Sequence, residues 1–292
     1  MKGFEDYNPA VFFLYFFSVT LVAMLSRNPV IAALWLVGGV MLFICRRRTA
    51  GARTHLVFLL LFAVMSLINP LFYHNGVTVL FVFNNNPVTL EALIYGIFSS
   101  AMIISVLYWF SSFSNIMTSD RLLYVFGAVS PKLALILSMT LRYIPLFGVQ
   151  VRKTNRAQRA LGLYGEDNAI DNLRGSSRVL SVMVTWALEN GIVTADSMVA
   201  RGYGTGKRSR FSLYNVSRPD IILVAFTLVL LAASLAGVIT GALDFEYYPR
   251  FSPPALSALS QVAYSAYGVL AVLPAAIEIK EGVQWKYFLS RV

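Results

Sequence analysis

The chain has 292 residues, of which 57% are hydrophobic and only 13% are charged, and its net charge is +10. Soluble domains usually carry about 25% charged residues, so this composition excludes a single water-soluble core and indicates that lipid surrounds part of the chain. The basic excess is better explained by loops held on the cytoplasmic side of a membrane than by binding to nucleic acid.

Six stretches without Asp, Glu, Lys or Arg are long enough for membrane-spanning helices, which need about 20 apolar residues. We therefore predict an all-α integral membrane protein with about six transmembrane helices. Only Arg27 and Asn28 separate the first two stretches, which predicts a tight helical hairpin with Pro29 opening its second helix. The predicted spans are Ala10–Ser26, Pro29–Cys45, Leu56–Tyr73, Ala92–Phe113, Ile221–Leu243 and Ala255–Ile277.

The distribution of Lys and Arg predicts the side of the membrane on which each loop lies. Arg46–Arg48 follows the second span, so the positive-inside rule places this end, and with it both termini, in the cytoplasm. The outer loops then contain only Arg27 and Arg250 of the 24 basic residues. The six-span count is therefore self-consistent. Within the outer loop His74–Glu91, the run Gly76–Phe83 is expected to be extended or interfacial.

The segment between the fourth and fifth spans differs from a connecting loop. From Ser114 to Arg218 it has fourteen basic and six acidic residues, a balance of +8 that accounts for most of the basic excess. A segment of this length is expected to be structured and functional. We therefore predict three regions: a four-span membrane region 1–113, a basic cytoplasmic or interfacial helical region 114–220, and a two-span membrane region 221–292.

Capping residues predict the first helices of this basic region. Ser119-Asp120 is expected to cap a helix beginning at Arg121. Ser130-Pro131 has the pattern of an N-cap followed by proline at the first helical position. The apolar run that follows is expected to lie against or partly within the bilayer, and Pro145 is expected to kink it.

A separate basic helix is predicted next. Arg152, Arg156 and Arg159 are spaced i, i+4, i+7 and therefore share one face of it. Gly162 and Gly165 are expected to end this helix.

A further helix is predicted from about Ser176 to Arg201. Gly202 and Gly204 are expected to end it, because glycine readily adopts the left-handed conformation of a helix cap. Arg201 at the negative end of the helix dipole has a simple structural explanation. However, two helix ends that both offer arginine and stop at glycine also suit docking into acidic grooves, because the planar guanidinium binds carboxylates in a bidentate manner.

The sequence offers little for catalysis or for a cofactor. The segment Gly202–Ser209 lacks the first glycine of a phosphate-binding loop, and Arg208 stands where a Ser or Thr must contact magnesium. His55 and His74 are predicted on opposite sides of the membrane, so they are not expected to share a metal. No predicted span carries a charge that would indicate a proton or ion relay. We therefore predict no catalytic, metal or cofactor residues.

Five short motifs occur in an order that carries a family resemblance: Asn69–Leu71, Glu91–Gly96, Ser130–Pro145, Asn155–Arg159 and Ser197–Gly204. Together they resemble the transmembrane T component of energy-coupling factor transporters, the CbiQ/EcfT family. The resemblance extends roughly from Asn8 to Arg218, and the sixth predicted span lies beyond it.

The resemblance implies a function and a set of partners. In that family the T component joins two ABC-type ATPase subunits to a small membrane subunit, the S component, which binds a vitamin or a metal ion. The resemblance therefore implies a coupling scaffold of an importer in the plasma membrane of a prokaryote. It further implies that ATP hydrolysis belongs to the partners, so that this chain is not itself an enzyme and holds no cofactor.

The resemblance also nominates docking residues. In the family, two cytoplasmic coupling helices each end in an Ala-Arg-x motif that docks into an ATPase, and Ala200-Arg201-Gly202 matches the second motif. At the first, Ala160-Leu161-Gly162, leucine replaces the arginine. Either Arg159 or Arg156 takes over its role, or docking is weaker there. Arg152 completes the nominated basic face.

Two other classes of function compete with this one. A self-sufficient secondary transporter or channel would need ionisable groups or broken helices at mid-membrane. A membrane-embedded enzyme, such as a lipid transferase, would use the basic segment to bind anionic headgroups. Such an enzyme also needs an acid or base cluster, and the closest candidates, Glu166, Asp167 and Asp171, are explained more simply as a solvated turn.

Overall fold

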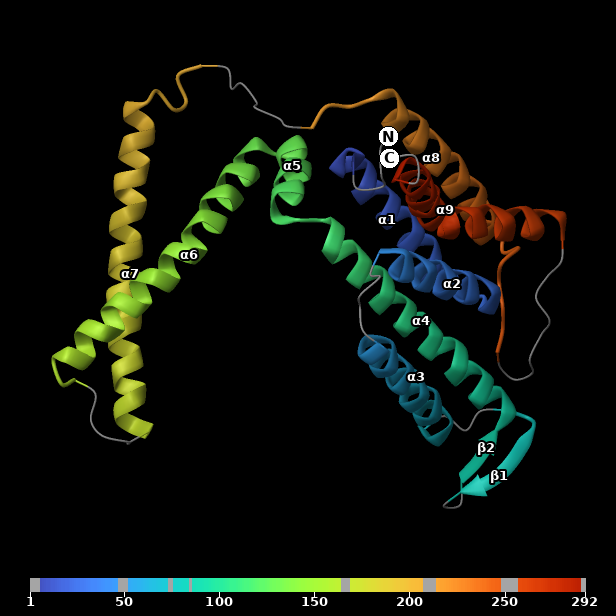
Figure 1. The fold of residues 1–292 in the computed structure, drawn as a ribbon. Helices are drawn as coiled ribbons and strands as arrows, with labels where there is room; N and C mark the ends of the chain where they lie inside the picture. The colour runs from blue at the N-terminus through green and yellow to red at the C-terminus, as the bar shows by residue number, and fades with distance from the viewer. Residues whose placement is uncertain are drawn as a thin grey trace. The chain divides into compact units, whose positions relative to one another are not determined.

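The structure, a computed structural model, describes residues 6–46, 52–72, 76–83, 86–163, 169–206, 214–247 and 257–289. These residues form nine α-helices and one two-stranded hairpin (Figure 1). The elements are α1 Pro9–Leu25, α2 Pro29–Arg46, α3 Ala52–Phe72, β1 Val79–Phe83, β2 Asn86–Thr89, α4 Leu90–Ile116, α5 Ser119–Val129, α6 Pro131–Ala160, α7 Ala169–Ala200, α8 Arg218–Ile239 and α9 Ala258–Leu289.

The described residues divide into two compact units. One, the bundle unit, lies within Met1–Leu122 and Tyr214–Val292 and contains α1 to α4, α8, α9 and the β-hairpin. The other, the helix-pair unit, lies within Leu123–Leu213 and contains α6 and α7. In each unit the helices pack against one another.

Helix α2 is the centre of the bundle unit. It packs against α4 and α9, α3 covers α4, and α8 joins α9 to α1 (Figure 1). The core between these helices is aromatic, and the side chains of Tyr15, Trp35 and Tyr267 are fully buried in it. Both tyrosines donate to helix carbonyls, Tyr15 to that of Leu270 and Tyr267 to that of Val19 at 3.3 Å. The indole Nε1 of Trp109 donates to the backbone carbonyl of Trp35 at 2.9 Å.

Two glycines allow α2 to approach its neighbours closely. A Cβ atom at Gly38 would lie 2.6 Å from the carbonyl oxygen of Ala271 in α9. A Cβ atom at Gly39 would lie 2.7 Å from the ring of Trp109 in α4. Small residues at such crossings are the usual means of packing helices in a membrane, where lipid removes the hydrophobic drive for association.

The variant Gly38→Ala is expected to destabilise the protein, because the new methyl group must push α9 away from α2. Gly282→Ala is the matched control, since nothing lies within 4 Å of a Cβ built at that helical position. There the helix propensity of alanine should stabilise by up to about 1 kcal/mol. The measurement is the thermal unfolding midpoint in detergent. Equal midpoints for the two variants would contradict the close α2–α9 crossing.

A buried carboxylate links the N-terminal ends of α1 and α8 through hydrogen bonds. Asp220 is completely buried, and its Oδ1 atom accepts the backbone N–H of Asn8 at 3.1 Å. Its Oδ2 atom accepts the backbone N–H of Ser217 at 2.7 Å, which is the carboxylate half of a capping box. The same oxygen also accepts the Ser217 hydroxyl. Burial and the charge of Asp220 together raise the pKa of Tyr7. This network joins segments that are 212 residues apart in the chain.

The opposite ends of these helices are joined by an amide and a phenol. The side-chain Nδ2 of Asn28, in the α1–α2 connection, donates to the carbonyl of Leu243 at 3.1 Å and to the hydroxyl of Tyr264 at 2.6 Å. Tyr247 donates to the carbonyl of Arg27 at 3.0 Å, and burial together with Tyr95 raises the Tyr247 pKa well above its ordinary value. The short α1–α2 connection is therefore held by residues from the α8–α9 segment.

The all-α membrane fold is confirmed, with changes in the helix bounds. Among the described residues, six helices are long and apolar enough to cross a membrane: α2, α3, α4, α6, α8 and α9. The first predicted span corresponds to α1, which has 17 residues and is shorter than these six. The predicted tight connection before Pro29 is present, although α1 packs mainly on α8 rather than on α2. The run Gly76–Phe83 is extended in part as predicted, since it contains β1, which pairs with β2.

Some details of the prediction were wrong. The apolar run after Ser130 and the basic helix after it are one continuous helix, α6, with Pro145 inside it. Helix α5 begins at Ser119 rather than at Arg121, and α7 begins at Ala169 rather than near Ser176. Helix α9 continues to Leu289, twelve residues past the predicted end of the last span. Gly165 and His74 lie outside the described residues.

The longer helices also bring charges to the ends of the bundle. Arg46, the last residue of α2, lies 3.9 Å from Glu278 in α9, and both side chains are largely buried. Neither residue lies in an uncharged run, so the sequence placed both outside the spans. The pair joins the end of α2 to the C-terminal half of α9, within the bundle unit.

Candidate functional site

Helices α6 and α7 form an antiparallel pair whose contacts are polar and aromatic in part. The hydroxyls of Tyr143 and Thr194 lie 3.0 Å apart, and the ring of Phe147 meets Trp186 edge to face with centroids 5.5 Å apart. Further along, Arg178 of α7 donates to the carbonyl of Leu163, just beyond the end of α6, at 2.6 Å. These contacts fix where the two long helices cross.

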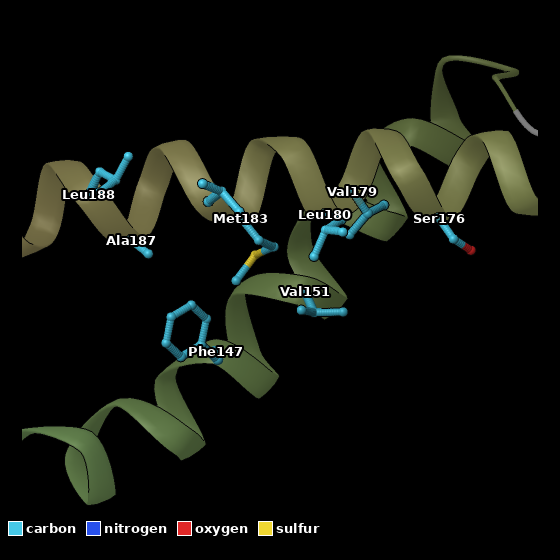
Figure 2. A pocket seen from close by; sticks show the side chains of 9 residues that line it. Phe147, Val151, Ser176, Val179, Leu180, Met183, Ala187 and Leu188 are labelled. Atoms are coloured by element: carbon cyan, nitrogen blue, oxygen red, sulfur yellow. The ribbon is translucent and has the colours of Figure 1, made fainter. Parts of the chain in front are cut away.

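An open apolar groove of about 530 Å³ lies between the two helices. Figure 2 shows Met183 of α7 reaching toward Phe147 and Val151 of α6. Met183 and Val179 are buried in the groove floor, whereas Leu180, Val184 and Leu188 are exposed. The exposed three are spaced i, i+4, i+8, so they form one stripe along α7. Such a stripe is suited to receiving another apolar helix.

Both helices end in the same backbone motif. After α6, the N–H of Gly162 donates to Arg159 at 3.0 Å, and the N–H of Leu163 donates to Gln158 at 3.1 Å. After α7, the N–H of Gly202 donates to Val199 at 2.9 Å, and the N–H of Tyr203 donates to Met198 at 3.0 Å. These paired bonds define a Schellman cap in each case.

The left-handed glycine of each cap confirms the predicted helix stops. The φ angle is +66° at Gly162 and +81° at Gly202, a region that favours glycine. Gly204, also predicted as a stop, has φ +91°. In both caps an alanine is the last helical residue, and the residue after it occupies the C-cap. Leu161 and Arg201 therefore hold equivalent positions.

The two caps lie at opposite ends of the helix pair. Arg178 contacts the chain just after α6, and the stretch of α7 from Arg178 to Ala200 is roughly 33 Å long at about 1.5 Å per residue. In Figure 1 the ends of α6 and α7 accordingly point away from each other. The pair thus presents two separate helix tips, which we call the α6 tip (Ala160–Leu163) and the α7 tip (Ala200–Tyr203).

The predicted docking residues are divided between these tips. Ala200, Arg201 and Gly202 lie together in the α7 tip, and all three are exposed. Arg152, Arg156 and Arg159 lie on the last three turns of α6 and are also exposed. The structure does not bring the two groups together. Their roles as docking residues remain predictions.

Two features of this site were not predicted from the sequence. One is the brace from Arg178 to the carbonyl of Leu163, which holds the chain just after α6 against α7. The other is the groove, because a stripe of apolar residues does not reveal which face of α6 it meets. The spacing of Leu180, Val184 and Leu188 was the only available signal for it.

The sequence has recognisable relatives. The family model of CbiQ, described as "Cobalt transport protein", matches residues 5–213, which extends from the start of α1 to the end of α7 and leaves α8 and α9 beyond the match. The chain is 27% identical over 115 residues to the "Energy-coupling factor transporter transmembrane protein EcfT" of Lactobacillus helveticus (strain DPC 4571), which covers 39% of this chain and 42% of that relative.

A second relative gives a similar result. The chain is 32% identical over 105 residues to the "Energy-coupling factor transporter transmembrane protein EcfT 1" of Listeria monocytogenes serotype 1/2a (strain 08-5578), covering 35% of this chain and 39% of that relative. The chain therefore matches about two fifths of the length of each of these relatives. The family match covers most of the chain and agrees with the resemblance carried by the five motifs. The chain belongs to the CbiQ family.

Proposed function

We propose that this protein is the transmembrane T component of an energy-coupling factor importer for a vitamin or a metal ion. In this role it joins two ABC-type ATPase subunits to a small substrate-binding membrane subunit and has no catalytic activity of its own. The observation that carries the proposal is the pair of exposed, identically capped helix tips, one of which presents Arg201. The names of the two EcfT relatives support it.

The helix pair is suited to transmitting movement. Helices α6 and α7 have 30 and 32 residues, so each is a continuous rod of about 45 to 48 Å. Because Tyr143–Thr194 and Phe147–Trp186 contacts link the rods, a displacement at either tip changes how they cross. Closure of the ATPase pair on ATP binding would therefore move the groove between the rods, and with it any subunit that the groove holds.

The apolar groove is the proposed site of the substrate-binding subunit. Its exposed stripe, Leu180, Val184 and Leu188, would contact an apolar helix of that subunit. Val184→Asp is expected to prevent assembly with this subunit, because an unpaired carboxylate would be buried at the contact. ATPase binding at the tips should persist. The measurement is the composition of the complex that co-purifies with the tagged chain.

Val182→Asp is the matched control for this experiment. It makes the same change on the same helix, at an exposed apolar position that does not line the groove. Assembly should survive in this variant. Loss of the substrate-binding subunit from both variants, or from neither, would contradict the assignment of the groove.

The proposed arrangement in the membrane follows the distribution of basic residues. We place both termini in the cytoplasm of a prokaryotic cell, the region 114–220 in the cytoplasm or at the cytoplasmic face of the bilayer, and the spans of regions 1–113 and 221–292 in the plasma membrane. The exposed apolar side chains of α3, such as Leu59, Leu67 and Phe72, then face lipid. The tips of α6 and α7 lie on the side where ATP is available.

An uptake measurement separates this proposal from a self-sufficient transporter. Proteoliposomes that contain the chain alone should accumulate no substrate. Proteoliposomes that also contain the ATPases and the substrate-binding subunit should accumulate it when ATP is supplied. Accumulation by the chain alone, driven by an ion gradient, would contradict the proposal.

A further inference from the structure

Another cavity, of about 320 Å³, lies in the bundle unit at the N-terminal ends of α1 and α8, which pack against each other (Figure 1). The proposed membrane arrangement places both ends on the cytoplasmic side. The cavity is lined by one residue just before α1 and by five from the start of α8: Tyr7, Arg218, Pro219, Ile222, Leu223 and Phe226. It is separate from the groove between α6 and α7, so the proposed function assigns it no role.

The lining of this cavity changes from charged to apolar along α8. Arg218, Ile222 and Phe226 are spaced i, i+4, i+8 and therefore share one face of the helix. Arg218 is exposed at the first position of α8, and Ile222 and Phe226 are 68% and 43% exposed. These eight steps extend over about 12 Å. One face of α8 thus offers a cation at the end of an apolar track, which suits an amphipathic ligand.

The depth of this face in the proposed membrane arrangement matches a phospholipid. The uncharged run of α8 begins at Ile221, and the rise from Arg218 to this residue is about 4.5 Å. The headgroup layer is about 5–8 Å thick on each side of a hydrocarbon core of about 30 Å. Arg218 therefore lies among the headgroups, while Ile222 and Phe226 lie beside the acyl chains.

The guanidinium of Arg218 is available for a ligand. In the part of the chain that the structure describes, Arg218 forms no ion pair. The carboxylate nearest to it in sequence, that of Asp220, is fully buried, and its oxygens accept from Asn8 and Ser217. Tyr7 adds a phenol to the cavity lining, and its raised pKa keeps the hydroxyl protonated and able to donate. Both polar groups of the lining thus suit an anion.

We propose that this cavity binds one anionic phospholipid of the cytoplasmic leaflet. The lipid phosphate accepts charge-assisted hydrogen bonds from Arg218 and a further one from Tyr7, and an acyl chain lies along Ile222 and Phe226. A lipid with net negative charge is preferred over a zwitterionic one, whose headgroup brings a second cation to the site. The lipid links the ends of α1 and α8 from the membrane side, as Asp220 links them from within.

Native mass spectrometry of the full chain tests this assignment. The protein is released from micelles that contain phosphatidylglycerol and phosphatidylcholine in equal amounts, and the retained lipids are identified. We expect one retained phosphatidylglycerol. Arg218→Gln should lower its retention by about tenfold or more, because hydrogen bonds to a charged group typically contribute at least this factor. Equal retention of the two lipids by the unsubstituted chain would overturn the proposal.

Arg53→Gln is the matched control. It makes the same change in charge at an exposed residue near the start of α3, on the same predicted side of the membrane and outside the cavity. This variant should retain phosphatidylglycerol. Loss of the lipid from both variants, or from neither, would overturn the proposal.

A third variant tests the apolar half of the site. Ile222→Trp keeps Arg218 and fills the track that the acyl chain occupies, so it should also lower the retention of phosphatidylglycerol. Unchanged retention in this variant would overturn the placement of the lipid in the cavity.

Thermal unfolding in detergent gives an independent measurement. Without lipid, Arg218→Gln should unfold at the midpoint of the unsubstituted chain, because the side chain is exposed. Added phosphatidylglycerol should raise the midpoint of the unsubstituted chain and not that of Arg218→Gln, because a ligand stabilises only a protein that binds it. An equal rise in both proteins would contradict a lipid site at Arg218. None of these outcomes depends on ATPase binding, so they leave the proposed function untouched.

Discussion

Reversing the charge of Arg201 (Arg201→Glu) is expected to abolish co-purification of the ATPase at the α7 tip and to abolish transport, while insertion into the membrane persists. Arg201 is exposed at the very end of α7, so its loss removes no contact within the bundle unit. Its proposed partner is a carboxylate in the ATPase groove, and reversal would place two negative charges together. Truncation of one partner of such a pair costs about 2 kcal/mol or more, so Arg201→Ala should weaken ATPase affinity by about 30-fold.

Two further variants show whether the effect belongs to this side chain. Arg201→Lys keeps the charge but loses the planar fork, so its affinity should lie between those of the unsubstituted protein and Arg201→Ala. Arg174→Glu makes the same change in net charge near the start of α7, where Arg174 is exposed and pairs only loosely with Asp171 at 3.8 Å. This control should bind ATPase normally. A complex that assembles normally with Arg201→Glu would refute the docking role.

Replacement of Asp220 by alanine is expected to be the most destabilising single change in the bundle unit. The carboxylate is fully buried and accepts the backbone N–H groups of Asn8 and Ser217, which would both lose their partner. Each buried unsatisfied group costs about 1–3 kcal/mol, so a loss of about 3 kcal/mol is expected. The thermal unfolding midpoint in detergent should fall accordingly, and the contact between the entries of α1 and α8 should loosen.

The fall in the unfolding midpoint of Asp220→Ala is compared with the midpoints of two other variants. Asp220→Asn keeps one acceptor oxygen but turns the other into a donor that faces Ser217, so its midpoint should be intermediate. Asp171→Ala removes a partly exposed carboxylate of α7 whose ion pair with Arg174 is worth at most about 1 kcal/mol. A midpoint for Asp220→Ala equal to that of Asp171→Ala would contradict the buried network.

The spans were predictable because lipid imposes a strong and local condition on sequence. Runs without charge identified α2, α3, α4 and α8 within a few residues. Helix ends beyond those runs were less predictable. Glu278 was placed past the last span because it is charged, yet α9 continues through it, and its charge lies against Arg46. A helix ends where its capping allows, and not where its apolar run stops.

The continuity of α6 shows a second limit to predicting helix boundaries from local sequence. Pro145 removes one backbone donor, and the change from apolar to basic residues follows soon after it, so two helices were expected. The structure keeps one helix, in which the remaining hydrogen bonds and the contacts of Tyr143 and Phe147 with α7 lie on either side of the proline. Tertiary contacts of this kind cannot be inferred from local sequence.

The α6 tip and the α7 tip illustrate both what the sequence predicts and what it does not. Gly162 and Gly202 gave a strong local signal, and the structure confirms both as left-handed caps. The equivalence of Leu161 and Arg201 follows from that signal. The groove and the Arg178 brace depend on which faces of α6 and α7 meet, and the sequence contains no local signal for that pairing.

Purification of the tagged full chain from its native membrane in a mild detergent, with identification of the bound proteins, tests the central claim most directly. The proposal predicts a stable complex with two ABC-type ATPase subunits and a small membrane subunit, and it predicts that Arg201→Glu releases the ATPase from the α7 tip. A chain that purifies without any ATPase, and that takes up a substrate by itself when reconstituted, would contradict the claim that this protein couples ATP hydrolysis in its partners to transport.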